Sequence, residues 1–131
     1  MCRAVTRQIQ VTVEPRYVAE ESAPEEGRWF WAYEVEIANL VGDDVVQLRT
    51  RHWRITDATG RVQEVRGIGV VGEQPVLAPG ESFSYVSGCP LPTPSGIMAG
   101  SYRMEAPNGE GFDVVIPAFS LDLPDARRTL N

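Results

Sequence analysis

Alternation of apolar and polar side chains is the feature that most constrains how this chain folds. Large apolar side chains occupy the odd positions from Trp29 to Ile37, whereas Glu34 and Glu36 fall between them. Successive side chains of an extended strand point to opposite faces, so a period of two indicates a strand with one buried face. The pattern therefore predicts a β-strand from Trp29 to Leu40.

Turn-forming residues divide the rest of the chain into further short strands. Gly60, Gly80 and Gly109 mark three of the turns, and the Asn-Gly pair at 108–109 is a strong hairpin signal. We expect Val62 to anchor the short strand at 61–66. Strands this short, with turns about every ten residues, predict an all-β antiparallel sandwich of seven to eight or more strands. The other predicted strands cover residues 5–13, 45–57, 61–66, 81–88, 100–106 and 111–116.

The strand predicted at 45–57 changes face part-way along. Val46 and Leu48 lie at even positions, whereas Trp53 and Ile55 lie at odd ones, so a regular strand would send the two pairs to opposite faces. A β-bulge between residues 49 and 52 would return both pairs to the same face. The alternative is that both faces of the strand are partly covered and that no bulge exists.

Charge and composition disfavour several classes of function. The 131 residues carry 12 arginines and no lysine against 18 acidic side chains, which gives a formal charge of −6. A Schiff-base or P-loop lysine is therefore absent, and the acidic balance disfavours a coat of nucleic acid. The chain has no signal-peptide h-region and no apolar stretch of about 18 residues, so we expect a cytoplasmic protein without a membrane contact. We expect one domain over residues 1–131, with a core at about 5–124 and a frayed tail at 125–131.

Few residues are suited to catalysis or to holding a metal. His52 is the only histidine, and Cys2 and Cys89 lack the spacing of a metal site or a disulfide framework. No nucleophile-and-base motif accompanies them. We therefore predict no enzymatic activity, no metal site and no cofactor, with both cysteines as structural thiols.

Gly67, Gly69 and Gly72 have the G-x-G-x-x-G spacing of a phosphate-binding loop. In dinucleotide-binding folds a helix follows such a loop, but prolines at positions 75 and 79 oppose one here. One interpretation is a packed loop whose glycines adopt positive φ angles. The other is an anion site built from backbone N–H groups, with Arg66 beside it, for a phosphate-containing small molecule.

The arginines cluster between residues 49 and 66. This segment holds five arginines against two carboxylates, a local balance of +3 in an acidic chain. Guanidinium groups pair with carboxylate or phosphate, so the segment is suited to a phosphorylated ligand or an acidic peptide. The alternative is that the arginines pair across strands with the chain's own carboxylates, such as Glu34 and Glu36. The predicted partner surface comprises Arg49, Arg51, His52 and Arg54.

Four segments of the chain are together similar to one known family. They are Arg51–Asp57, Val65–Pro75, Leu77–Tyr85 and Thr93–Tyr102, and the similarity runs in order from about residue 5 to residue 124. These segments resemble the bacterial ApaG family. The resemblance implies a single ApaG domain with an immunoglobulin- or fibronectin type III-like β-sandwich. It also implies that the glycine motif is the position proposed in this family to bind pyrophosphate.

The resemblance further implies a class of function. ApaG domains occur as modules in eukaryotic F-box proteins and in a DNA polymerase delta-interacting protein, where they are assigned to protein–protein contacts. Bacterial members are linked to cobalt and magnesium tolerance, and no catalytic activity is established for the family. We therefore predict a non-enzymatic module, a monomer or weak dimer, that binds an unidentified protein partner. The alternative is a binder of pyrophosphate-containing nucleotides, or of anions linked through a divalent cation, at the glycine-rich loop.

Overall fold

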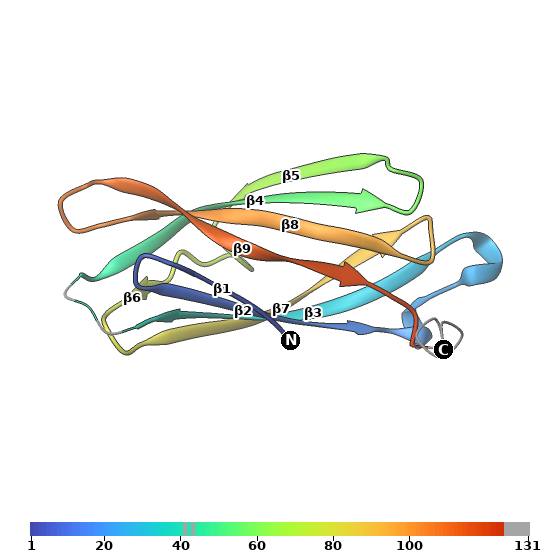
Figure 1. Cartoon of the computed structure of the whole chain (residues 1–131), viewed down its shortest axis with the longest axis horizontal. Helices are drawn as coiled ribbons and strands as arrows, with labels where there is room; N and C mark the ends of the chain where they lie inside the picture. Colours follow the sequence, from blue (N-terminus) through green and yellow to red (C-terminus); the bar gives the residue numbers. More distant parts are fainter. Residues whose placement is uncertain (41, 43, 125–131) are drawn as a thin grey trace.

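Two antiparallel β-sheets pack face to face in the computed structural model, which describes residues 1–40, 42 and 44–124. One sheet has the strand order β1-β2-β3-β7 and the other the order β5-β4-β8-β9, with β6 paired to β4. Figure 1 shows the two sheets as layers, with the β5-β4-β8-β9 sheet above. The fold-class prediction is confirmed. The described strands are β1 (Cys2–Thr6), β2 (Ile9–Tyr17), β3 (Trp29–Asn39), β4 (Val46–Asp57), β5 (Val62–Ile68), β6 (Val76–Leu77), β7 (Ser82–Leu91), β8 (Gly96–Glu105) and β9 (Gly111–Leu121).

The core lies between the sheets and is filled by alternate residues of their inner faces. Trp31, Tyr33, Val35 and Ile37 of β3 are buried, as the period of two predicts. Two single-turn 3-10 helices, at 19–21 and 24–26, connect β2 to β3. Among the described residues, no helix has the length and apolar character needed to cross a membrane. The predicted tail at 125–131 lies outside the described residues.

Two details of the predicted strands are wrong. The strand predicted at 5–13 is a hairpin, because β1 ends at Thr6 and β2 begins only at Ile9. Arg7 makes the turn with a φ of 52°, which few residues other than glycine adopt, so no ordinary turn residue marks it. Val62, the predicted anchor of β5, is 43% exposed. Val62 lies in an edge strand, which has a neighbouring strand on one side only.

The predicted bulge in β4 is present, and Arg49 is its extra residue. Leu48 and Thr50 pair with consecutive residues of β8, so the residue between them has no partner in that register. Trp53 and Ile55 consequently return to the buried face that Leu48 occupies. The bulge therefore lets both halves of β4 contribute to one core.

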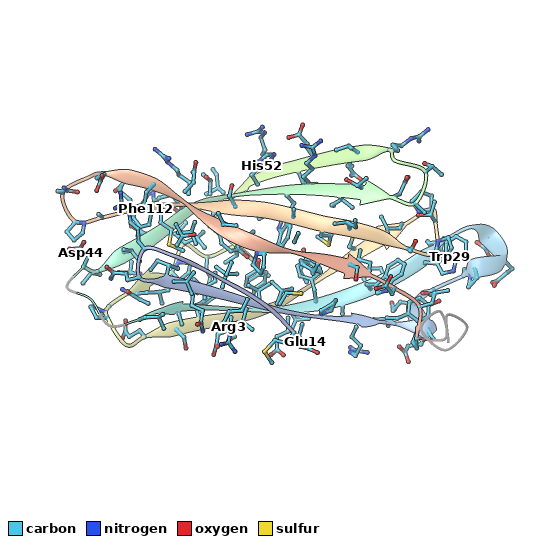
Figure 2. The ribbon with its side chains drawn as sticks, viewed as in Figure 1. Arg3, Glu14, Trp29, Asp44, His52 and Phe112 are labelled. Atoms are coloured by element: carbon cyan, nitrogen blue, oxygen red, sulfur yellow. The ribbon has the colours of Figure 1, made fainter. Side chains whose placement is uncertain are left out.

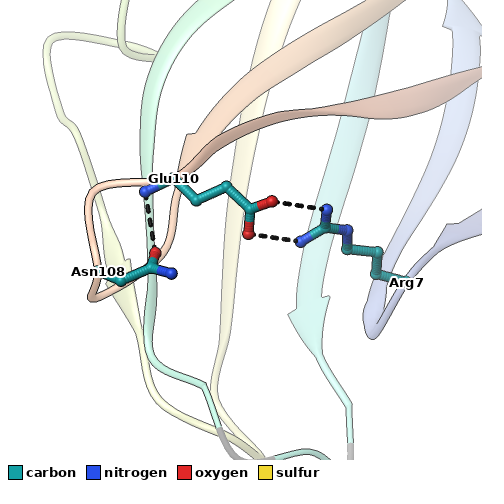
Figure 3. A network of polar contacts seen from close by, with 3 residues as sticks. All are labelled: Arg7, Asn108 and Glu110. Carbon is teal, nitrogen blue, oxygen red and sulfur yellow. Dashed lines mark hydrogen bonds and ion pairs between the residues drawn. The ribbon is translucent and has the colours of Figure 1, made fainter.

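The two long sides of the sandwich differ. On one side β1 and β9 lie together, because the Val115 N–H donates to Thr6 Oγ1 at 3.0 Å. Arg7 adds an ion pair with Glu110, with 3.3 Å between Nη1 and Oε1 (Figure 3), and its guanidinium lies 4.4 Å from the centroid of the Phe112 ring. On the other side β5 and β7 are the last strands of their sheets, and a cavity opens between them. The sandwich is thus closed along one side and open along the other.

Candidate functional site

The cavity between β5 and β7, which we call the slot, has a volume of about 330 Å³. It has an apolar wall, polar groups from the opposite sheet and one charged side chain. A concave site with mostly apolar walls and a few polar groups is typical of a ligand site. The residues that line the slot are Tyr33, Arg51, Trp53, Ile55, Gln63, Val65, Val70, Val71, Tyr85, Ser87, Gly88, Cys89, Pro90 and Met98.

Arg51 lines the slot because it follows the bulge in β4. Its position has the same parity as Trp53 and Ile55, so its side chain points from the inner face of the sheet into the slot. Nη1 donates to the carbonyl oxygens of Ile68, at 3.2 Å, and Gly69, at 2.8 Å. Among the described residues, no carboxylate oxygen lies within 4.0 Å of this guanidinium. The slot therefore contains a positive charge with backbone carbonyls as its only described partners.

Two glycines of the motif allow close approaches in this region. A Cβ atom on Gly67 would lie 2.6 Å from the guanidinium atoms of Arg51, so any side chain there would displace that group. Gly69 has a φ of 66°, and a Cβ atom there would collide with the carbonyl oxygen of Glu73. The first two motif glycines thus serve the packing of Arg51 and of the loop itself.

Val71 and Gly72 form a tight turn at the mouth of the slot. Both have positive φ angles, 42° and 81°, as in a type I′ hairpin turn. The N–H groups of Val70 and Glu73 each donate to the other's carbonyl oxygen across this turn. A positive φ strains a β-branched residue such as valine. The side chain of Val71 is nevertheless 56% exposed, so burial does not offset this strain, and the nearby Ile68 is 73% exposed. Val71 therefore presents an apolar side chain to solvent at the slot, whereas Ile68, the last residue of β5, is exposed on the outer face of the sheet.

Hydrogen bonds within the loop bear on the predicted phosphate site. The N–H groups of Gly69, Val70 and Glu73 all donate to backbone carbonyls, that of Gly69 to Arg49 at 2.9 Å. Two carbonyl oxygens of the loop point instead toward Arg51. An anion-binding nest needs several free N–H groups that converge. Much of this loop's donor capacity is already used for its own folding.

A second group of predicted residues lies on the outer face of the β5-β4-β8-β9 sheet. His52 Nε2 lies 2.7 Å from Glu64 Oε1, and Arg66 Nη2 lies 3.6 Å from the same oxygen. These contacts lower the pKa of Glu64, chiefly through the hydrogen bond with His52. Arg54 pairs in register with Glu64. Figure 2 shows His52 pointing away from the sandwich.

The structure divides the predicted partner surface in two. Arg51 lines the slot, whereas His52 and Arg54 alternate with it and face outward. Arg49 is exposed at the bulge, where Nη1 donates to Gln47 Oε1 at 3.1 Å. The slot and the outer face are therefore separate candidate surfaces.

The alternative that these arginines pair with Glu34 and Glu36 is wrong, although one arginine of the segment, Arg66, does pair with a carboxylate of the chain, that of Glu64. Glu34 and Glu36 lie on the outer face of β3, in the opposite sheet, where Glu34 faces Glu14 of β2 in register. Figure 2 shows Glu14 on the side of the sandwich away from His52. Packed sheets are about 10 Å apart, so side chains on the two outer faces cannot meet.

Three tyrosines form the polar part of the slot and the core behind it. Burial raises the pKa of Tyr33, Tyr85 and Tyr102, and the nearby charge of Arg51 lowers each pKa by less. A hydrogen bond with the Ser87 hydroxyl also lowers the pKa of Tyr33, while Tyr85 and Tyr102 share a hydrogen bond between their hydroxyls. Because burial dominates, all three hydroxyls are neutral near pH 7, and in each hydrogen-bonded pair one hydroxyl keeps its proton free to donate elsewhere.

The slot also contains a thiol that is poorly suited to nucleophilic chemistry. Burial raises the pKa of Cys89 to about 11, so the reactive thiolate is scarce at neutral pH. Cys2 and Cys89 are both free thiols. Among the described residues, no group of three or more His, Cys, Asp or Glu side chains is placed to hold a metal ion.

Sequence reasoning missed the polar residues of the slot. Tyr33, Tyr85 and Ser87 come from the opposite sheet, and no local pattern shows which strands of two sheets face each other. A signal for Arg51 does exist, because it shares odd parity with Trp53 and Ile55, the two apolar side chains that the sequence places on one face of the strand.

Comparison with known proteins identifies the family. The family model of the ApaG domain matches residues 19–106. The chain belongs to the ApaG family. It is 65% identical to Protein ApaG of Bradyrhizobium sp. (strain ORS 278) and 63% identical to Protein ApaG of Methylobacterium sp. (strain 4-46), over the whole of each chain. The crystal structure of the putative ApaA protein from Bordetella pertussis superposes with a TM-score of 0.85 at 53% identity, covering 88% of this chain and 94% of that one.

Proposed function

We propose that this ApaG-family protein is a non-enzymatic, cytoplasmic binding module whose protein partner adds an extended segment to the free edge of β7. The observation that carries the proposal is the nature of that edge. β7 runs from Ser82 to Leu91 without a charged residue and is the last strand of its sheet. Edge strands offer unpaired N–H and C=O groups, and proteins usually protect them with charges, prolines, bulges or covering segments. The only proline in β7 is Pro90, next to the end of the strand. An uncharged edge is suited to strand addition.

The surroundings of β7 supply further support. Val86 on its outer face is 59% exposed, and the exposed side chain of Val71 lines the slot. Alternate side chains of an added strand point to opposite faces, so every second one would face the slot. A segment that carries apolar side chains at those positions would bury them against Trp53 and Val65. Backbone hydrogen bonds would then supply affinity and the slot would supply specificity.

The titration of the slot's side chains supports a binding role over a catalytic one. The titratable groups that line the slot from β3 and β7 are Tyr33, Tyr85 and Cys89, and burial raises the pKa of each. General bases and nucleophiles need pKa values near or below the working pH.

The family resemblance also links bacterial members to cobalt and magnesium tolerance. We propose that this link reflects the activity of the protein partner.

The predicted alternatives remain separate proposals for other parts of the surface. A phosphate-containing ligand at the glycine loop would have to use Arg66 and the N–H groups that the loop leaves free. A partner on the outer face would contact Arg49, His52 and Arg54, where the charge is positive. Either contact would leave β7 uncovered, so the sites can be distinguished by position.

Site-specific photocrosslinking in living cells tests the proposal. A benzoylphenylalanine at Val86 is expected to yield a discrete adduct with another protein. The same group at Ile97 is the matched control and should yield no adduct, because Ile97 is similarly exposed (53%) but lies on β8, a central strand with neighbours on both sides. An adduct from Arg54 and none from Val86 would move the contact to the outer face. An adduct between two copies of this chain would make the partner a second copy.

A purified complex allows a quantitative check. Val86→Lys places a charge on the edge and should weaken the complex by about tenfold or more, whereas Ile97→Lys should leave the affinity unchanged. Equal effects of the two substitutions would show that the edge of β7 is not the contact.

A further inference from the structure

The charge of Arg51 has no counterpart inside the slot. A guanidinium group has five N–H donors in a planar fork, and the carbonyls of Ile68 and Gly69 occupy only those of Nη1. Arg51 is half-buried, and taking a charge even partly out of water costs free energy unless the charge is paired. No described carboxylate lies within 4.0 Å. Arg51 thus lies on the inner face of a sheet with unused N–H donors and no anion beside it, an arrangement suited to binding an anionic ligand.

The guanidinium is also held in place before any ligand arrives. It packs so closely on the backbone at Gly67 that a Cβ atom there would lie 2.6 Å away. The loop carbonyl of Gly69 fixes it from another direction, at 2.8 Å. A donor group that is already ordered loses little entropy on binding, and the planar fork of arginine matches a carboxylate.

The opposite sheet supplies neutral donors. Tyr33, Tyr85 and Ser87 line the same cavity as Arg51, and the two tyrosines are near enough for its charge to influence their pKa. Phenol and hydroxyl groups that stay protonated can donate hydrogen bonds to an anion without adding charge. The polar end of the slot therefore combines one positive charge with uncharged donors.

The other walls are apolar and set the size of the ligand. Trp53, Ile55, Val65, Val70 and Met98 line this part of the cavity. A volume of about 330 Å³ lies near the lower limit for small-molecule sites, enough for a body of one or two rings. Arg51 is the only basic residue among those that line the slot, so a single negative charge is matched and a polyphosphate is not.

We infer that the slot is a binding site for small monocarboxylates with an aromatic or apolar body, whose carboxylate pairs with Arg51. The inference goes beyond the proposed function, because it concerns a ligand inside the slot and does not depend on any partner at β7. Trp53 and its neighbours contact the body of the ligand. The hydroxyls of Tyr33 and Ser87 line the same end of the slot as the guanidinium and add a hydrogen bond to the ligand's carboxylate.

Phenylacetate titrated into the full-length protein, followed by amide chemical shifts and calorimetry, tests the inference. We expect saturable binding below about 10 mM, with the largest shifts at residues lining the slot. Phenylacetamide has the same body without the charge and should bind at least about tenfold more weakly. Pyrophosphate should bind more weakly than phenylacetate, and the reverse order would favour a phosphate site.

Variants of Arg51, compared with a control variant of Arg54, give the decisive test. Arg51→Gln is expected to weaken phenylacetate binding by about tenfold or more, while Arg54→Gln, on the outer face of the same strand, should leave it unchanged. If Arg51→Gln does not fold, Arg51→Lys keeps the charge and loses the fork, and a several-fold loss is still expected. No saturable binding to the wild-type protein, or equal binding by the folded Arg51 variant and the Arg54→Gln control, would overturn the inference. Failure of crosslinking at Val86 would leave it intact.

Discussion

Replacing Gly67 with alanine is expected to destabilise the protein through Arg51 and not through the backbone. The φ of Gly67 is outside the positive range, so alanine fits the strand conformation there. An added Cβ atom would nevertheless lie 2.6 Å from the guanidinium atoms of Arg51 and push them away from the loop carbonyls. The cost should therefore depend on the residue at position 51.

The size of the effect follows from the bonds that would be lost. The bond from Arg51 to Gly69 is 2.8 Å long and partly buried, and that to Ile68 is 3.2 Å long and exposed. Together they contribute about 2 kcal/mol, since bonds from charged donors are strong but solvent weakens the exposed one. Alanine is favoured over glycine in a strand by about 0.5–1 kcal/mol. Gly67→Ala should thus cost about 1–1.5 kcal/mol in the wild-type background.

A double-mutant cycle with urea unfolding, followed by tryptophan fluorescence, measures this dependence. In an Arg51→Ala background the collision is absent, so Gly67→Ala should stabilise the protein by about 0.5–1 kcal/mol. The coupling energy is then about 2 kcal/mol, or roughly a 1 M difference in midpoint. Gly72→Ala is the control, because its φ of 81° makes it costly while no atom lies within 4 Å of its Cβ position. An equal cost of Gly67→Ala in both backgrounds would refute the assignment of this glycine to Arg51.

Three further predictions concern other parts of the sandwich. Asn39 is buried and its side-chain nitrogen donates two hydrogen bonds of 2.9 Å, so Asn39→Leu should cost about 3 kcal/mol and lower the melting temperature by about 10 °C in calorimetry. Asn108→Ala is the control: it removes one exposed hydrogen-bond acceptor and should lower the free energy of unfolding by less than about 1 kcal/mol. Similar costs for Asn39→Leu and Asn108→Ala would contradict this reasoning. Cys89, with a pKa of about 11, should react with a thiol reagent at pH 8 only as the protein unfolds, and rapid labelling of the native state would show that it is accessible. His52→Ala should raise the pKa of Glu64 toward its ordinary value in an NMR titration, because the hydrogen bond from His52 is the chief cause of its lowering; an unchanged pKa would show that Arg66 and Arg54 suffice.

The strands that alternate strictly could be predicted closely, whereas features set by distant residues could not. β3 was expected from Trp29 to Leu40 and runs from Trp29 to Asn39. The hairpin at Arg7 was missed because its stabilising contacts, an ion pair with Glu110 and stacking on Phe112, lie more than 100 residues away in sequence. Contacts between β1 and β9 therefore decide a turn that local propensity does not indicate.

The candidate site divides in the same way. The parity change in β4 predicted a bulge, and the bulge at Arg49 places Arg51 and Trp53 on the same face as Leu48. What no pattern in one strand shows is the strand that faces it across the sandwich, which supplies Tyr33 and Tyr85. The G-x-G-x-x-G spacing indicated a phosphate loop, but two of its glycines make room for Arg51 and for the carbonyl of Glu73.

The single extra residue in β4 has an evolutionary consequence. Deleting Arg49 would leave a regular strand with Leu48 and Trp53 on the same face, so the core would tolerate the loss of one codon. The carbonyl that accepts the Gly69 N–H would go with it, and with it the anchor of the loop beside the slot. A relative one residue shorter between these positions is thus expected to keep the sandwich and to differ in what it binds.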